Sequence, residues 1–171
     1  MEPLEVSEFF YLHDYYPCNE GNDLAILHLK KKVSSNEALP ICIAERDEAT
    51  NDLLYTAGTG FDPDKGEPEE QDYELQKVSL FRTREYGDQI VTVDKESSLC
   101  SGDSGGPLFQ TSKADQLVQF GVAASVDPKC GAPHEYMTTY FTDVRKHLDW
   151  ICVNTGVCPK EDYIHDGDGG F

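Results

Sequence analysis

Short apolar runs separated by polar or glycine-rich turns follow one another along the chain, a pattern typical of an all-β protein. The clearest run, Asn22 to Leu29, lies between Gly21 and three lysines and predicts a buried strand. A short extended segment is expected at Leu39 to Ile43, because residues before a proline avoid the helical region. Further strands are predicted at Phe9 to Leu12, Leu53 to Ala57, Leu75 to Leu80, Gln89 to Val93, Pro107 to Gln110 and Leu117 to Ala124.

One amphipathic helix is predicted near the end of the chain. Thr142 or Asp143 is a suitable N-cap, and Gly156 is a natural stop. Residues 61–74 are instead charged and contain proline and glycine, so they predict a surface loop. The apolar positions of the helix recur four and then three residues apart: Val144, Leu148 and Ile151.

The composition narrows the class of partner. The chain has 171 residues and a formal net charge of −18, which disfavours nucleic acid and anionic lipid and favours a basic protein partner. No apolar run approaches the roughly 20 residues of a membrane helix. A monomer with one sizeable core is expected, and no metal or cofactor is indicated, because there is no Cys-x-x-Cys spacing and no two histidines are near neighbours.

The beginning of the chain and its cysteines point in different directions. Residues 1–5 lack the basic end and apolar stretch of a secretory signal. Six cysteines in a β-rich chain nevertheless favour an oxidising, extracellular compartment. Both observations are explained if the chain lacks its true N-terminal part.

The string Cys100-Ser101-Gly102-Asp103-Ser104-Gly105-Gly106-Pro107-Leu108 is the most informative motif. Its glycines allow a tight turn that exposes the Ser104 hydroxyl. The backbone N–H groups of Gly102 and Ser104 would then converge where an oxyanion forms during acyl transfer. The simpler interpretation is a glycine-rich turn between two strands.

This string resembles the nucleophile motif of the trypsin and chymotrypsin family of serine proteases, peptidase family S1. The end of the chain, from Asp149 to Cys158, is similar to divergent trypsin-like proteins of nematodes. The resemblance implies a chymotrypsin-like double Greek-key β-barrel with the second barrel mostly complete, the first truncated, and a C-terminal α-helix. It divides the chain into a partial peptidase domain at 1–158 (first-barrel remnant and linker 1–60, second barrel 61–141, helix and cysteine pair 142–158) and an acidic disordered tail at 159–171.

The resemblance also assigns a catalytic aspartate. The Asn22 to Leu27 string is similar to the family's aspartate motif, so Asp23 would orient the catalytic histidine. The family's histidine lies about 45 residues before the aspartate, and only 22 residues precede Asp23. None of the five histidines is a good candidate for the base: His13, His28, His134, His147 and His165.

Other roles follow from the same resemblance. Asp103 matches the aspartate that pairs with a new amino terminus after cleavage, and no suitable cleavage string occurs here. Ser98 matches the base of the substrate pocket and carries no charge. Val126 and Thr139 match wall positions that glycines occupy in trypsin-like members, so they would narrow the pocket and favour small apolar residues. Ala124, Ser125 and Thr59 depart from the family pattern.

Six cysteines permit 15 pairings, so the connectivity is inferred from the resemblance. Cys100 and Cys130 match the bridge that joins the nucleophile loop to the pocket wall. Cys152 and Cys158 can close the end of the helix. Cys18 and Cys42 can pair with each other or with cysteines of an absent segment.

Two functions from different classes remain. In the first, the chain is the later part of a serine endopeptidase that acts on polypeptides and is inactive alone because it lacks the histidine. In the second, the fold is kept for binding a basic partner without turnover. A third interpretation is an incomplete product that folds poorly, because an opened first barrel exposes strand edges.

Overall fold

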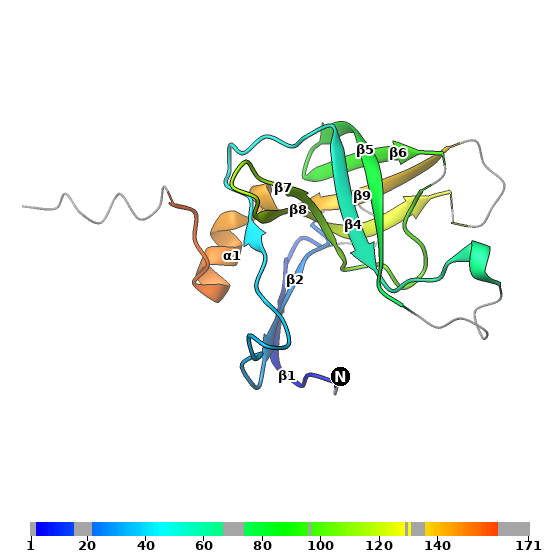
Figure 1. The fold of residues 1–171 in the computed structure, drawn as a ribbon. Helices are drawn as coiled ribbons and strands as arrows, with labels where there is room; N and C mark the ends of the chain where they lie inside the picture. Colours follow the sequence, from blue (N-terminus) through cyan, green and yellow to red (C-terminus); the bar gives the residue numbers. More distant parts are fainter. Residues whose placement is uncertain are drawn as a thin grey trace, which may run out of the picture.

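The computed structural model describes residues 3–15, 22–66, 74–95, 97–128, 130 and 136–160 (Figure 1). Strands dominate the described residues, together with short 3₁₀ turns and an α-helix. In chain order the elements are β1 (Val6–Tyr11), β2 (Ala25–Leu29), β3 (Cys42–Ile43), β4 (Leu53–Gly58), η1 (Pro63–Lys65), β5 (Gln76–Tyr86), β6 (Gln89–Asp94), β7 (Pro107–Thr111), β8 (Leu117–Asp127), β9 (Met137–Asp143), η3 (Val144–Lys146) and α1 (Leu148–Thr155).

Six of these strands form a closed antiparallel barrel. The order is β8-β7-β4-β5-β6-β9, and pairing of β8 with β9 closes it, while β3 adds to β8 in parallel. Removal of the inward side chains from water stabilises the barrel. The prediction of an all-β fold is confirmed, and the barrel is consistent with a chymotrypsin-like fold. The largest apolar side chains of its core are Leu54, Leu80, Ile90, Leu108, Phe120 and Phe141.

The hairpin β1–β2 is a separate two-stranded sheet that projects away from the barrel (Figure 1). One face meets α1, since the His28 ring Nε2 lies 3.0 Å from the Asn154 carbonyl oxygen. The cross-strand pair Phe9 and Leu27 lies on the other face, with 65% and 60% of these side chains exposed. The prediction of a buried strand is therefore wrong for β2, because nothing in the described ranges covers this face.

Leu24, immediately before β2, is the buried anchor of the hairpin. It packs in a second apolar cluster with Val144 and Ile151 and is 8% exposed. We expect Leu24→Ala to lower the free energy of unfolding by about 2 kcal/mol, because it leaves a cavity. Leu27→Ala is the matched control and should cost under about 0.5 kcal/mol. Urea unfolding measures both, and equal losses would contradict this description of the hairpin.

The end of the chain differs from the prediction. Thr142 and Asp143 do not begin the helix but end β9, a strand that the sequence analysis missed. The Asp143 side chain does cap a helical turn, by accepting from the Arg145 N–H, but that turn is η3. The α-helix begins only at Leu148, and Gly156 ends it in the left-handed conformation, as expected. The predicted disordered tail lies largely outside the described residues.

The strands β4 to β8 were predicted with shorter bounds. In particular, β5 continues to Tyr86 and β8 to Asp127. No helix in the described ranges is both long and apolar enough to cross a membrane.

Candidate active site

The Ser104 loop connects β6 to β7 and is fixed to the barrel on both sides of the serine. The Asp103 N–H donates to the Cys100 carbonyl oxygen at 3.0 Å, which closes a tight turn through Gly102. The Gly105 N–H donates to the Ala123 carbonyl oxygen at 2.9 Å and ties the loop to β8. Gly102 and Gly105 have φ angles of 100° and 84°, which favour glycine. Ser104 is exposed at the top of this turn.

The backbone amides of the loop divide into two sets. Those of Asp103, Gly105 and Gly106 donate to carbonyl oxygens within the fold. Those of Gly102 and Ser104 donate to no described residue. The two amides that the sequence assigns to the oxyanion hole therefore have no acceptor among the described residues, as a site for developing negative charge requires.

The Asp103 side chain is partly buried and fixes the base of the loop. Its carboxylate accepts from the Gly60 N–H at 2.7 Å and from the Cys100 N–H at 2.8 Å. A side chain at Gly58 or Gly60 would collide with this carboxylate. The sequence analysis named a new amino terminus as the family's partner for Asp103, and in this structure backbone amides hold its carboxylate.

A cavity of about 560 Å³ lies beside Asp103, and Ser98, Lys95 and Met137 also line it. Val126 and Thr139, the predicted pocket walls, lie directly opposite each other on β8 and β9. Neither of them lines this cavity. The structure therefore pairs Val126 with Thr139 and places Ser98 in a cavity that these two residues do not line.

Asp23 is held at the same part of the barrel as Ser104. The Thr142 hydroxyl donates to the Asp23 carbonyl oxygen at 2.9 Å. Thr142 pairs with Val122, the neighbour of the Ala123 that binds the Ser104 loop. Partial burial raises the pKa of the Asp23 carboxyl above its ordinary value, and no described residue donates a hydrogen bond to it.

Three of the five histidines lie in the described part of the chain, and none bonds to Ser104 or Asp23. The His28 ring contacts the Asn154 carbonyl oxygen, and His147 Nε2 lies 3.7 Å from an Asp88 oxygen. The His13 ring lies near the Tyr11 ring. His134 and His165 are outside the described residues. The carboxylate and the hydroxyl thus lack an imidazole partner in the ranges that the structure describes.

Two disulfides are present. Cys100 bonds to Cys130, which ties the nucleophile loop to the segment before β9, and Cys152 bonds to Cys158 after α1. Cys42 is free and exposed. Cys18 lies outside the described residues, so its pairing stays a prediction.

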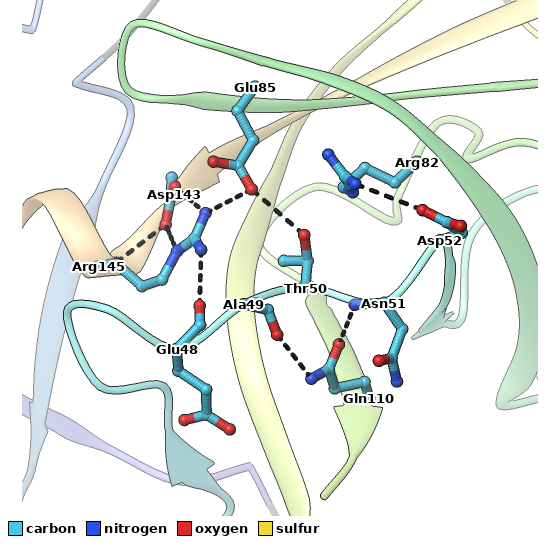
Figure 2. Close-up of polar contacts among 10 residues, drawn as sticks. All are labelled: Glu48, Ala49, Thr50, Asn51, Asp52, Arg82, Glu85, Gln110, Asp143 and Arg145. Atoms are coloured by element: carbon cyan, nitrogen blue, oxygen red, sulfur yellow. Dashed lines mark hydrogen bonds and ion pairs between the residues drawn. The ribbon is translucent and has the colours of Figure 1, made fainter.

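A buried ionic cluster that the sequence analysis did not predict supports the end of β9 (Figure 2). Arg145 makes a bidentate contact to the Asp143 carboxylate, at 2.9 and 2.6 Å. Its Nη1 donates to the Glu48 carbonyl oxygen at 2.8 Å, and Nη2, which also contacts Asp143, lies 2.9 Å from the Glu85 carboxylate. Hydrogen bonding to Asp143 raises the pKa of the Arg145 guanidinium. The cluster joins β9, β5 and the segment after β3.

An all-β barrel that presents an exposed serine beside two unused backbone amides is the architecture of a chymotrypsin-type serine protease. The trypsin family model matches residues 2–151. The chain therefore belongs to the trypsin family.

Its relatives are longer proteins. Phenoloxidase-activating factor 3 of Holotrichia diomphalia is 30% identical over 155 residues, which cover 80% of this chain and 42% of that protein. Granzyme B(G,H) of Mus musculus is 30% identical over 152 residues, covering 81% and 58%. Brachyurin of Leptuca pugilator is 25% identical over 166 residues, covering 91% and 70%. The chain thus spans less than half of the first of these proteins.

Proposed function

We propose that the chain carries the nucleophile and the aspartate of a serine endopeptidase and needs a catalytic imidazole that none of its five histidines supplies. The supporting observation is the exposed Ser104 hydroxyl beside the unused amides of Gly102 and Ser104. In this proposal Ser104 is the nucleophile, and Asp23 orients and stabilises the imidazole. The attachment of both residues to the β8–β9 pair supports their joint role.

The reaction is acyl transfer. The Ser104 oxygen attacks the peptide carbonyl while the imidazole accepts its proton, and the two amides bind the resulting oxyanion. The amine leaves with that proton, and water then releases the acyl group by the same route. Without an imidazole Ser104 has no route to lose its proton, so the 171-residue chain alone should be almost inert.

Substrate selection follows from the pocket residues. Ser98 lines the cavity beside Asp103 and offers no charge for a basic side chain, whereas Val126 and the buried Thr139 do not line it. We propose a preference for polypeptides without a basic residue before the cleaved bond. The two disulfides also support an oxidising, extracellular compartment.

Labelling by a fluorophosphonate probe tests the nucleophile. A longer natural product that includes a histidine upstream should be labelled at Ser104 at least roughly 10³-fold faster than the 171-residue chain. Ser104→Ala should abolish labelling, whereas Ser101→Ala, the matched control on the same turn, should retain it. Mass spectrometry of the labelled peptide identifies the site. Failure of the longer product to react under activating conditions would overturn the proposal.

A second candidate function is binding without turnover. The observation in its favour is that no described histidine bonds to Ser104 or Asp23. The net charge of −18 favours a basic protein partner. In that case Ser104→Ala should leave binding of the partner unchanged.

A further inference from the structure

The tight turn between β5 and β6 reaches the backbone that leads into Asp23. The Asn22 N–H donates to Asp88 Oδ2 at 2.5 Å, across 66 residues of sequence. Asn22 has a φ of 55°, in the left-handed region that asparagine adopts more readily than most residues with a side chain. The contact from the Asp88 carboxylate to its amide helps to hold the chain in this conformation.

Asp88 belongs to a closed circuit of contacts around Asp23. The Asp88 carbonyl oxygen accepts from the Asp143 N–H at 2.7 Å. The preceding residue, Thr142, donates its hydroxyl to the Asp23 carbonyl oxygen. The end of β9 thus fixes Asp88 and Asp23, while the Asp88 carboxylate fixes Asn22 between them. Of these contacts, removal of the carboxylate breaks only the one to Asn22 and leaves the two contacts to β9 in place.

We propose that Asp88 is a positioning residue for Asp23, which it serves by fixing the Asn22 backbone from which the aspartate follows. This inference rests on the proposed role of Asp23 in catalysis. The acceptor is the Asp88 carboxylate, on a turn between β5 and β6 that the sequence analysis did not assign to the site. Its loss should change the environment of Asp23 without removing a core side chain.

The neighbouring His147 leaves Asp88 available for this contact. Its side chain is 10% exposed, and its Nε2 has no hydrogen-bond partner among the described residues. Burial lowers the pKa of the His147 imidazole, and the charges of Asp88 and Asp143 only partly oppose this. Burial thus disfavours the charged ring that would draw the Asp88 carboxylate into an ion pair.

Carboxyl NMR titration of Asp23 and amide exchange at Asn22 test the proposal in the full chain. In Asp88→Ala the Asn22 amide should exchange at least roughly tenfold faster, because a hydrogen bond to a charged acceptor is lost. The pKa of the Asp23 carboxyl should fall toward its ordinary value as the segment becomes solvated. Asp88→Asn retains an acceptor oxygen and should preserve both values.

Asp94→Ala is the matched control, because Asp94 accepts from the Ser97 N–H at the other end of β6. It should leave Asn22 and Asp23 unchanged. If Asp88→Ala does not fold, Asp88→Glu, which keeps the charge but moves the oxygen, should alter Asp23 where Asp88→Asn does not. Unchanged Asn22 exchange and Asp23 titration in Asp88→Ala, or equal changes in Asp94→Ala, would overturn the proposal. Probe labelling of Ser104 in the longer product tests the proposed function separately.

Discussion

Replacing Arg145 by alanine is expected to lower the free energy of unfolding by about 3–5 kcal/mol, the largest effect of any single substitution considered for this fold. The loss is large because the partner of Arg145, the Asp143 carboxylate, is buried. The Asp143 side chain is 1% exposed, and without Arg145 it would keep a charge in the barrel wall with little compensation. Urea unfolding followed by circular dichroism measures the loss.

Arg46→Ala is the control for this prediction. Arg46 pairs with Asp149 at 2.6 Å, but both side chains are exposed, so the loss should be at most about 1 kcal/mol. The double variant Asp143→Ala with Arg145→Ala should be more stable than Arg145→Ala alone, because no buried charge is left unpaired. A double variant that is less stable than the single one would contradict the argument.

The same cluster contributes to acid sensitivity. Burial alone would raise the pKa of the Glu85 carboxyl, but hydrogen bonds and charge from Arg145, with Thr50 and Arg82, lower it on balance. A carboxyl whose pKa is lowered by folding stabilises the native state above its unfolded pKa, and this stability is lost as pH falls through the folded value. Arg145→Ala should therefore weaken the dependence of stability on acidic pH.

Replacing Gly60 by alanine is expected to cost about 3 kcal/mol and to release the nucleophile loop. An added Cβ would lie 2.5 Å from the Asp103 Cγ, so the carboxylate must move away from the amides of Gly60 and Cys100. Since those bonds fix the base of the Ser104 turn, probe labelling of the longer product should fall together with stability. Thermal unfolding and labelling rates check the two parts.

Gly156→Ala separates this collision from the ordinary cost of replacing a glycine. Gly156, at the end of α1, has a φ of 75° and open space where a Cβ would stand. We expect a loss of about 1 kcal/mol from backbone strain alone, with labelling unchanged. Equal effects at both positions would show that contact with Asp103 is unimportant.

The sequence predicted most barrel strands because their apolar residues stand in short runs between turns. It missed β9 because Thr139 and Thr142 look polar, yet they are 1% and 0% exposed. Asp143 has the side chain of an N-cap and does cap η3, so the error concerned only which helical turn follows. The exposure of β2 could not be predicted, because an apolar run does not state whether another segment covers it.

The candidate site was predicted to a similar extent. The Cys100 to Leu108 string identified the turn with an exposed serine, because glycines at fixed positions dictate local geometry. The partners of Asp103 and Asn22 were not predicted, since Gly60 and Asp88 lie 43 and 66 residues away in sequence. Contacts over such separations depend on how the barrel closes, which local patterns do not encode.

Closure of the barrel by β8 and β9 couples assembly of the site to folding. The loop with Ser104 is bonded to β8 and the segment with Asp23 is bonded to β9, so the relative position of the two groups depends on the pairing of these strands. If β8 and β9 separated while the other strands stayed paired, most of the core would remain, but Ser104 and Asp23 would no longer be aligned with each other. A ligand that binds to both β8 and β9 would therefore stabilise the closed barrel.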